Sequence, residues 1–598
     1  MSRLARIALP CVALLALALA LYGGSLGYPL VFDDKRLVGA LAAMRDAGFS
    51  LERRGITFGS FGWIYGAFGP DWRWQRLANV LLHGAVAVAL FLFLRRLLAV
   101  VPGSPSGRAE PWYAFAGAAL FALHPAAVYG VAYLTQRSIL LATLFSLASL
   151  WLFLEGLLRR RWPWFAAAAF TYLLAVGSKE HSVMLPAVAA ALAILVRGWP
   201  PRPMANLALP FVLYAAIALA AVFQARGLLG GVYESLGPAA LKQAAESTGA
   251  APRQPYALSV INQGYLFFRY ILTWLLPWPG WMSIDLRPPF PAQLLSWPQS
   301  AGFLAWLAWP VAAAALLLRG GRPGLAGFAM LAPWLLALTE FVTVRVQEPF
   351  VLYRSYLWMC LAPAALPALL ARLGLRLALP LLAAAALALA PAFADRLRTF
   401  SSELALWEDA VRKLSDPSAP FTDRAYRNRG VAYFQAGRDP EALRDFDRAI
   451  ELHPGTPEGW ISRGTLYMRA AQSARARADF DRALALDPHN GEVLARRCIV
   501  LMRLERLDEA LADCTRAVEL GPADAAAHVV LGMVRALRGE AALAERSYLR
   551  ALELDASDGS AHYQYGVLLR GTGREEEAKR QFAAACKARV AAACRALP

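Results

Sequence analysis

Residues 430–454 read GVAYFQAGRDPEALRDFDRAIELHP, and this stretch decides the fold of the carboxy-terminal part of the chain. Residues 464–488 repeat its pattern 34 positions later as GTLYMRAAQSARARADFDRALALDP. The same spacing continues through five units, each with a small residue, an alanine, and an aromatic residue or cysteine. These columns are Gly430, Gly464, Cys498, Gly532 and Gly566; Ala442, Ala476, Ala510, Ala544 and Ala578; and Phe446, Phe480, Cys514, Tyr548 and Phe582. A fixed period of this length predicts a stack of repeated units.

Small residues where two helices touch, an aromatic wedge and a closing proline such as Pro454 closely resemble the tetratricopeptide (TPR) repeat. We therefore expect about five repeats in residues 422–598, preceded by a linker helix at residues 400–421. Each helix pair cannot bury its apolar face alone, so the pairs stack into an α-solenoid with a concave groove. Such grooves bind peptides or proteins. The alternative is a spacer that only orders itself.

The composition of the whole chain indicates a membrane protein with a soluble part attached. The chain has 598 residues, which is too long for one domain. It is 58% hydrophobic and 17% charged, whereas soluble proteins are about 45–50% apolar and about 25% charged. This composition excludes a disordered chain, a collagen-like chain and an ordinary cytosolic enzyme. Six cysteines are too few for a disulfide scaffold.

The basic charge of the chain lies entirely in its first part. The formal net charge is +18, and residues 400–598 contain equal numbers of basic and acidic side chains. The excess therefore falls among the apolar runs of residues 1–399. There it predicts basic flanks on membrane helices and a site for an anionic lipid-linked group. Nucleic acid is not an expected partner, whereas membrane lipids are.

Apolar runs long enough to cross the membrane fill residues 1–399. We expect about eleven spans, because a helix needs about 17–25 apolar residues to cross the hydrocarbon layer. They are residues 7–22, 77–98, 112–131, 139–158, 162–176, 182–196, 207–223, 301–318, 325–344, 357–371 and 375–394. Residues 261–281, interrupted by Arg269 and a Trp-Pro-rich end, read as an interfacial or re-entrant helix. For the first run, an uncleaved helix is favoured over a signal peptide.

The positions of the arginines predict the orientation of these spans. With about eleven spans, short loops such as residues 95–96, 159–161 and 319–322 fall on the cytoplasmic side, as the positive-inside rule requires. Everything after residue 394 then lies on the other side. We expect a multi-pass protein of the bacterial inner membrane with its repeats in the periplasm. If residues 261–281 cross the membrane, the repeats become cytosolic instead.

Polar residues gather in the loops that this topology places on the outward face. Two adjacent carboxylates directly after a membrane helix are costly there unless they are used. The basic candidates lie at helix ends at the membrane surface. The candidates are Asp33 and Asp34 as catalytic groups, and Arg137, Lys179, Glu180, His181 and Arg354 for a lipid phosphate or donor.

These residue types suit glycosyl transfer from a lipid-linked donor. A hydroxyl that attacks an anomeric carbon needs a carboxylate base within hydrogen-bond reach, which Asp33 or Asp34 could provide. The leaving lipid phosphate needs a cation in a water-poor site, which Arg137, Lys179 or Arg354 could provide. His181 could orient the phosphate or relay a proton.

Four short motifs and the repeats together resemble the transmembrane-and-TPR protein O-mannosyltransferases, the TMTC family. The motifs are Phe32-Asp33-Asp34, His124-Pro125, Gln136-Arg137 and Ser178-Lys179-Glu180-His181. The resemblance implies a GT-C fold that uses dolichyl-phosphate mannose on the lumenal side. It also implies that Asp33 and Asp34 are the family's catalytic acidic pair, and that Lys179-Glu180 are its lysine-glutamate pair. Tyr129 stands where the family has an acidic residue, and residues 354–358 match its arginine-tyrosine signature only loosely, so mannose is not assumed.

Each candidate also has a purely structural interpretation. Asp33 and Asp34 could cap a helix or pair with Lys35 and Arg36. Arg137 and Lys179 could anchor helix ends at lipid head groups, and Arg354 could pair with Glu348. His83 and His124 read as hydrogen-bonded helix residues. The seven histidines show no metal-binding spacing, so no metal site and no firm cofactor are predicted, and a divalent metal is possible but unsupported.

The sequence as a whole predicts an all-α protein: a polytopic GT-C-like helical bundle at residues 1–399, followed by a TPR solenoid. We expect a glycosyltransferase that moves a sugar from a polyprenyl-phosphate donor to a protein or glycan hydroxyl on the periplasmic face. The repeats would bind the acceptor protein or a partner. One alternative is an inert membrane scaffold for pilus, secretion or polysaccharide assembly. Another is a lipid-linked oligosaccharide ligase or polymerase.

The cysteines test the predicted compartment. Cys498 and Cys514 occupy positions of one repeat that pack against each other, and Cys586 and Cys594 flank the end of the last repeat. An oxidising periplasm favours a disulfide in each pair. The second pair needs a turn between its cysteines, because a continuous helix would hold them about 12 Å apart. The alternative is that cysteine serves as a small buried apolar residue.

Overall fold

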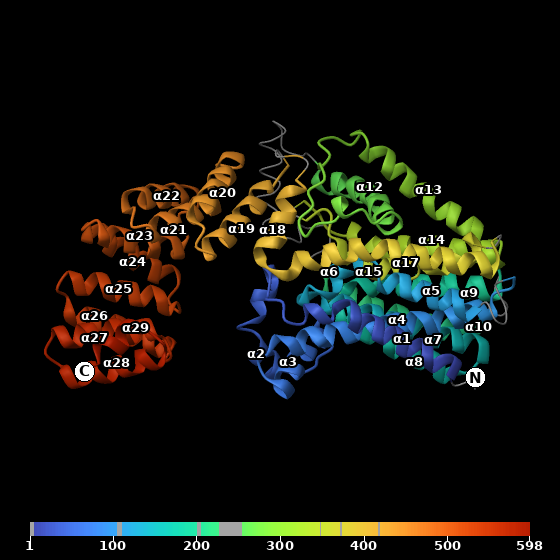
Figure 1. Cartoon of the computed structure of the whole chain (residues 1–598), viewed down its shortest axis with the longest axis horizontal. Helices are drawn as coiled ribbons and strands as arrows, with labels where there is room; N and C mark the ends of the chain where they lie inside the picture. The colour runs from blue at the N-terminus through green and yellow to red at the C-terminus, as the bar shows by residue number, and fades with distance from the viewer. Residues whose placement is uncertain are drawn as a thin grey trace. The chain divides into compact units, whose positions relative to one another are not determined.

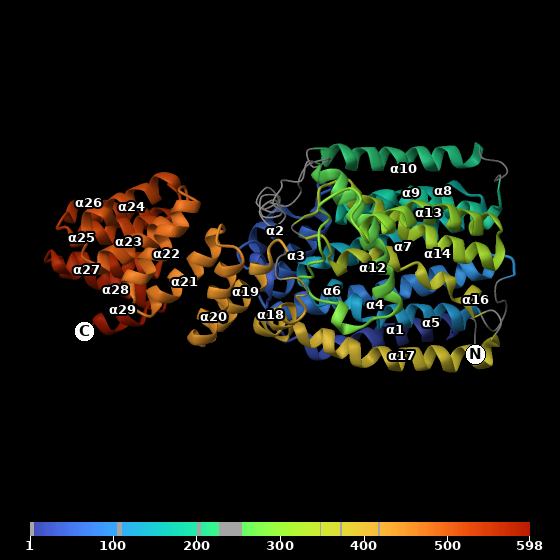
Figure 2. The same cartoon turned by 90° about the horizontal axis from the view of Figure 1, so that it is seen from above.

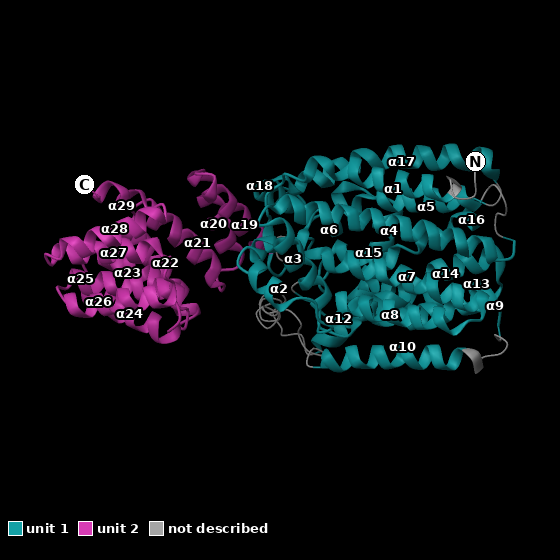
Figure 3. Cartoon of the chain, turned by 90° about the horizontal axis from the view of Figure 1, so that it is seen from below, with its two compact units in different colours: residues 1–421 teal, residues 422–598 magenta. Residues whose placement is uncertain are grey.

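The computed structural model describes residues 5–103, 110–199, 205–226, 254–346, 348–370, 373–414, 416 and 419–597. The chain is all-α. An isolated β-bridge joins Leu286 to Phe350. The chain forms two compact units, residues 1–421 and 422–598 (Figure 3). The predicted linker at residues 400–421 therefore belongs to unit 1.

The α-helices of unit 1 run along the chain in the order shown in Figure 1. They are α1 (Ala5–Tyr22), α2 (Leu41–Ala47), α3 (Gly55–Phe68), α4 (Trp72–Val100), α5 (Glu110–Ala122), α6 (Val128–Val131), α7 (Arg137–Arg159), α8 (Trp162–Ser178), α9 (Leu185–Arg197), α10 (Ala205–Gln224), α12 (Pro255–Leu275), α13 (Gln299–Leu318), α14 (Gly321–Ala337), α15 (Ser355–Met359), α16 (Leu366–Leu369), α17 (Gly374–Arg398) and α18 (Glu403–Arg412). The long helices lie side by side along one direction, and α2, α3 and α6 lie at one end of them (Figure 2).

Eight helices of the described chain are long and apolar enough to cross a membrane, or nine if a bent pair counts as one span. They begin at Ile7, Trp72, Leu134, Glu180, Leu207, Gln299, Gly321 and Gly374. The bent pair covers residues 110–131 and turns by 53° where Pro125 starts a new helical turn. The helix α12 is not among these eight.

Two runs that the sequence predicts as spans differ from that expectation. Residues 357–371 do not form one helix, because Pro363 and Pro367 divide them into α15, a 3₁₀ turn and α16. The helix α8 covers residues 162–176 but has only 17 residues in all, short of the length of the other candidates. The predicted number of about eleven is therefore higher than the number of described helices that meet this criterion.

Unit 2 consists of five helix pairs and a short final helix. The pairs are α19 (Thr422–Gln435) with α20 (Asp439–Leu452), α21 (Pro457–Arg469) with α22 (Ser473–Leu486), α23 (Gly491–Arg503) with α24 (Leu507–Leu520), α25 (Ala525–Leu537) with α26 (Ala541–Leu554), and α27 (Gly559–Gly571) with α28 (Glu575–Lys587); α29 (Ala591–Ala596) follows. The five predicted repeats are present at the predicted positions.

The repeating columns are explained by close contact between the two helices of each pair. A Cβ at Gly430 would lie 2.6 Å from the ring of Phe446, and one at Gly532 would lie 2.5 Å from the ring of Tyr548. Only glycine therefore fits opposite the aromatic ring. In the third repeat Cys498 and Cys514 replace this pair and form a disulfide with a Cα–Cα distance of 5.7 Å.

The second predicted disulfide is also present. Cys586 and Cys594 are bonded, with Cα atoms 4.8 Å apart. The chain turns between α28 and α29, which brings the two cysteines together as the sequence argument requires. The other two cysteines, Cys11 and Cys360, are free.

Candidate functional site

The loop after α1 is fastened to the end of the helix bundle by a buried arginine. Arg76, near the start of α4, is 3% exposed and donates hydrogen bonds to the carbonyl oxygens of Tyr28, Pro29 and Ala132. These bonds hold the chain just before the acidic pair against the segment that follows α6. Arg76 was not among the residues predicted from the sequence, although a basic residue at the edge of an apolar run often indicates a buried or functional side chain.

The surroundings of Asp34 give it a structural role. Its side chain is buried at 0% exposure, and its two oxygens accept the backbone N–H groups of Leu134 and Thr135 at 3.0 and 2.9 Å. These N–H groups open the 3₁₀ turn η4 (Leu134–Gln136), which leads into α7. Burial raises the pKa of the Asp34 carboxyl to about 7, against the opposing effect of the two backbone donors. Asp34 therefore joins its own 3₁₀ turn, η2 (Phe32–Leu37), to the start of α7.

Asp33 faces an open cavity instead. Its carboxylate accepts the Tyr133 hydroxyl at 3.0 Å and lies 3.2 Å from the Arg36 guanidinium, and its side chain is 34% exposed. The predicted pairing of the acidic pair with neighbouring basic residues is thus present for Asp33 and Arg36. The position of Asp33 leaves it accessible to a bound molecule.

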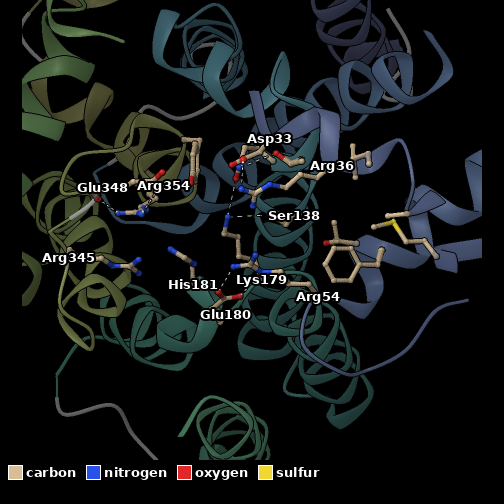
Figure 4. A pocket seen from close by; sticks show the side chains of 18 residues that line it. Asp33, Arg36, Arg54, Ser138, Lys179, Glu180, His181, Arg345, Glu348 and Arg354 are labelled. Carbon is tan, nitrogen blue, oxygen red and sulfur yellow. Dashed lines mark hydrogen bonds and ion pairs between the residues drawn. The ribbon is translucent and has the colours of Figure 1, made fainter. Parts of the chain in front are cut away.

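The cavity that Asp33 lines has a volume of about 460 Å³ (Figure 4). Five basic and three acidic side chains line it, along with His181. Asp33 and Arg36 come from one wall, Lys179 and Glu180 from a second, and Arg345, Glu348 and Arg354 from a third. The lining residues are Asp33, Arg36, Leu37, Ala40, Met44, Arg54, Thr57, Phe58, Thr135, Gln136, Ser138, Lys179, Glu180, His181, Arg345, Glu348, Tyr353 and Arg354.

Lys179 lines this cavity as a buried basic side chain. It follows the last residue of α8 and is only 4% exposed. Its Nζ donates to Gln136 Oε1 at 3.2 Å and to Ser138 Oγ at 3.4 Å, and no Asp or Glu of the described chain lies within ion-pair distance of it. Burial, together with the nearby Arg54 guanidinium, lowers the pKa of Lys179 to about 7.

The residue after Lys179 is paired with an arginine that the sequence argument missed. Glu180 accepts two hydrogen bonds from the Arg54 guanidinium, at 2.6 and 3.2 Å. Arg54 precedes α3 and has a left-handed backbone with φ of 61°. Lys179 and Glu180 therefore have different partners. Glu180 is bonded to the Arg54 guanidinium, whereas Lys179 donates to the uncharged side chains of Gln136 and Ser138.

A buried carboxylate contacts His181 and two arginines that line the cavity. Glu340, 2% exposed, lies 2.8 Å from His181 Nε2, 3.4 Å from Arg345 Nε and 3.2 Å from Arg354 NH1. Arg354 also lies 3.7 Å from the Glu348 carboxylate, which was the predicted structural alternative for this residue. His181 Nδ1 is buried and has no hydrogen-bond partner among the described atoms. His181 and Arg354 are thus fixed by Glu340 while both line the cavity.

Arg137 does not line the cavity, contrary to the expectation that all candidates share one site. It is 0% exposed, its Nε donates to Asn79 Oδ1 at 2.8 Å, and its NH2 donates to the Gln75 carbonyl oxygen at 2.8 Å. Its guanidinium carbon lies 3.8 Å from the centre of the Phe61 ring. Arg137 therefore ties α7 to α4, although its neighbours Gln136 and Ser138 do reach the cavity.

The two histidines interpreted as helix residues are hydrogen-bonded. His83 Nδ1 lies 2.6 Å from the Tyr356 hydroxyl and His83 Nε2 lies 3.0 Å from the Ala122 carbonyl oxygen. His124 Nε2 lies 3.0 Å from the Trp274 carbonyl oxygen, and its ring stacks on Trp274. No group of three or more His, Cys, Asp or Glu residues that could hold a metal ion occurs in the described part of the chain.

Comparison with known proteins identifies the repeats. Models of the tetratricopeptide repeat match residues 423–455, 461–525 and 497–560. Unit 2 carries tetratricopeptide repeats. Among curated proteins, a search found no significant match to the chain.

Solved TPR structures resemble the repeat part of the chain. One is YrrB, described as a TPR protein with an unusual peptide-binding site, with 24% identity over 32% of this chain and 96% of that chain, and a TM-score of 0.26. Another is pilF of Pseudomonas aeruginosa, which is 21% identical. The match covers 28% of this chain and 76% of that chain, with a TM-score of 0.26. A third is the thermophilic TPR protein TTC0263 of Thermus thermophilus, which is 25% identical. The match covers 29% of this chain and 99% of that chain, with a TM-score of 0.27.

The TPR repeats give unit 2 a protein-binding scaffold role. Ion pairs within and between the first three repeats join neighbouring helices of unit 2. Arg463 lies 2.7 Å from Asp479 of its own repeat and 2.7 Å from Asp447 of the preceding one. Arg497 repeats both contacts with Asp513 and Asp481. These ion pairs help to fix each helix pair to the next.

Proposed function

We propose that the chain is a membrane glycosyltransferase that moves a sugar from a polyprenyl-phosphate-linked donor to a hydroxyl group of a protein or glycan. In this proposal unit 1 is a GT-C-type helical bundle in the bacterial inner membrane. The TPR repeats bind the acceptor protein or a partner on the periplasmic side. The observation that carries the proposal is that Asp33 and the buried Lys179, which has no carboxylate within ion-pair distance among the described residues, line one cavity.

The chemistry assigns a role to each side of the cavity. The Asp33 carboxylate takes the proton of the acceptor hydroxyl as its oxygen attacks the anomeric carbon of the donor. The bond between this carbon and the phosphate oxygen breaks, and the phosphate leaves with the electron pair. The ammonium group of Lys179 stabilises the charge that grows on the phosphate.

The other basic residues of the cavity would orient the donor. Glu340 holds Arg354 and His181, so Arg354 presents its remaining N–H donors from a fixed position. The neutral His181 ring donates its Nε2–H to Glu340, which leaves its buried Nδ1, without a partner among the described atoms, as an acceptor for a sugar hydroxyl. A site built in this way holds a ligand with little reorganisation.

Two further features support a lipid donor and this location. A second cavity of about 760 Å³ lies among α5, α12, α13, α14, α16 and α17 and is lined mostly by apolar side chains such as Phe121, Trp309 and Leu389. It could hold part of a polyprenyl chain. The disulfides of the TPR repeats support an oxidising compartment, which for a bacterial membrane protein is the periplasm.

A catalytically inert TPR scaffold for pilus, secretion or polysaccharide assembly is the second candidate function. The TPR repeats favour this candidate, because they can bind a partner whether or not the chain has a catalytic activity. A scaffold does not require a buried cation next to an exposed carboxylate in a polar cavity. The two candidates therefore differ in what they expect of Lys179.

The test is binding of undecaprenyl phosphate to the purified full-length chain, measured by native mass spectrometry. We expect the phosphate to bind at least about tenfold more tightly than undecaprenol, and Lys179→Ala to remove this preference. Lys35→Ala is the matched control, because Lys35 is 44% exposed and does not line the cavity. Equal binding of the phosphate and the alcohol would contradict the proposed function and favour the scaffold.

A further inference from the structure

The helix α18, which precedes the TPR repeats in the chain, is bonded directly to the turn that carries Asp33. Glu403, its first residue, accepts the backbone N–H of Phe32 at 3.1 Å through Oε2. The same oxygen lies 3.0 Å from Lys35 Nζ. The other oxygen, Oε1, accepts the Trp407 indole N–H at 3.0 Å. One carboxylate thus joins two points of η2 to α18.

The contact holds Phe32 in an unusual backbone conformation. Phe32 has φ of 52°, in the left-handed region that residues other than glycine adopt only when their surroundings impose it. Its ring packs against the Trp407 ring in an edge-to-face arrangement, with centres 5.3 Å apart. Because Phe32 directly precedes Asp33, its backbone conformation sets the direction in which the Asp33 side chain leaves the chain.

The helix α18 is itself fixed to the bundle by buried charges. Asp409 accepts two hydrogen bonds from the Arg396 guanidinium of α17, each at 2.8 Å, and lies 2.6 Å from Lys413 Nζ. Arg396 also donates to the Met282 carbonyl oxygen at 2.6 Å. Glu403 therefore projects from a rigid support and not from a mobile linker.

We infer that Glu403 is a positioning residue for Asp33. It holds Phe32 in the left-handed conformation and so aims the Asp33 carboxylate into the cavity. The segment that leads into the TPR repeats thereby becomes part of the catalytic apparatus of unit 1. This role in aiming a general base rests on the proposed glycosyltransferase function, whereas the restraint on η2 does not.

The first test is hydrogen–deuterium exchange of the full-length chain in detergent micelles, followed in peptides that contain Phe32. Glu403→Ala removes the acceptor of the Phe32 N–H, so exchange of that amide should become about tenfold faster or more. Lys35→Met is the control. It removes the ion pair but leaves the hydrogen bond and the ring contact, so exchange should stay within about threefold of the wild type.

A second variant keeps this test decisive if Glu403→Ala unfolds the chain. Glu403→Gln retains an oxygen acceptor but weakens the bond, because charge-assisted hydrogen bonds are roughly twice as strong as neutral ones. A smaller rise in exchange, confined to residues 30–37, is then expected. Unchanged exchange at Phe32 in Glu403→Ala, or in Glu403→Gln where the alanine variant unfolds, would overturn the inference.

The second test uses turnover in membranes that contain the full-length chain and the host's own lipid-linked donors. Glu403→Ala should lower kcat by about tenfold to a hundredfold with little change in KM, because a misdirected base affects reaction more than donor binding. Glu403→Gln should recover part of the loss. An effect on KM alone would overturn the positioning role. If the wild type transfers no sugar, the proposed function fails, while the exchange experiment still decides whether Glu403 restrains the turn.

Discussion

Asp33 and Asp34 are consecutive in the sequence, yet their carboxyl groups lie in different environments. Asp33 lines the polar cavity and accepts the Tyr133 hydroxyl. Asp34 is fully buried and accepts the N–H groups of Leu134 and Thr135. The adjacent pair therefore separates into one carboxylate available for chemistry and one that stabilises the fold.

Asp33→Asn should leave the chain folded and able to bind its donor. The substitution keeps the shape of the side chain and leaves Lys179 in place, so binding of undecaprenyl phosphate should stay within about threefold of the wild type. The melting temperature should change little, because an exposed polar substitution typically costs less than about 0.5 kcal/mol. Native mass spectrometry and thermal unfolding measure the two quantities. Loss of lipid-phosphate binding would show that Asp33 has a different role.

Asp34→Ala should instead destabilise unit 1. It leaves the buried N–H of Leu134 without its acceptor, at a typical cost of about 1–3 kcal/mol, and also removes the acceptor of the part-buried Thr135 N–H. Asp34→Asn keeps one acceptor oxygen and should cost less than the alanine variant. Thermal unfolding of the purified full-length chain measures the difference. A melting temperature for Asp34→Ala equal to that of Asp33→Asn would contradict the division between the two residues.

Lys179 predicts a pH dependence of lipid-phosphate binding. Its pKa is lowered to about 7 in the free protein, so the side chain is charged below that pH and increasingly neutral above it. Between pH 7 and 9, where the phosphate is already largely a dianion, affinity for undecaprenyl phosphate should fall by up to about tenfold for each unit. In Lys179→Arg the cation stays charged and the fall should disappear. Affinity of the wild type that stays constant or rises between pH 7 and 9 would contradict the assigned role.

Much of unit 2 could be predicted because its geometry repeats in the sequence. Gly430 must be small because Phe446 lies against it, and the same constraint returns every 34 residues. The disulfide of the third repeat followed from the same register, because Cys498 and Cys514 take the positions of that glycine and that aromatic ring. Short-range periodicity of this kind needs no knowledge of distant contacts.

The cavity could be predicted only in part, because its partners come from distant segments. Lys179, His181 and Arg354 stood out as polar residues at the ends of apolar runs. Glu340 was missed, although a lone acid within residues 325–344 is itself a signal of function in a membrane helix. Arg54 and Glu403 carried no such signal, since both lie in polar segments where charged residues are common. Arg137 was expected at the cavity but does not line it, because position at a helix end does not reveal which way a side chain points.

The cysteine pair of the third repeat predicts strong coupling between two substitutions. Cys514→Phe alone should destabilise the repeats by about 1–3 kcal/mol, because the new ring would meet the Cβ of residue 498, as rings elsewhere would meet a Cβ at Gly430 or Gly532. Adding Cys498→Gly restores the glycine and aromatic pair of the other repeats and should recover most of the loss. Calorimetry of the full-length chain under reducing conditions, where the disulfide does not enter the comparison, measures this double-mutant cycle. Additive effects would contradict the packing account.

The most direct test of the account is intact-mass glycoproteomics of periplasmic and surface proteins in the native host. The strains compared would lack the chain, or carry the wild type, Asp33→Asn or Lys35→Ala in its place. The account predicts that at least one protein loses a sugar mass in the deletion strain. The wild type and Lys35→Ala should restore that mass, and Asp33→Asn should not, although it is expressed at the same level. Identical glycan masses in all four strains, or full restoration by Asp33→Asn, would contradict a glycosyltransferase that uses Asp33 as its base.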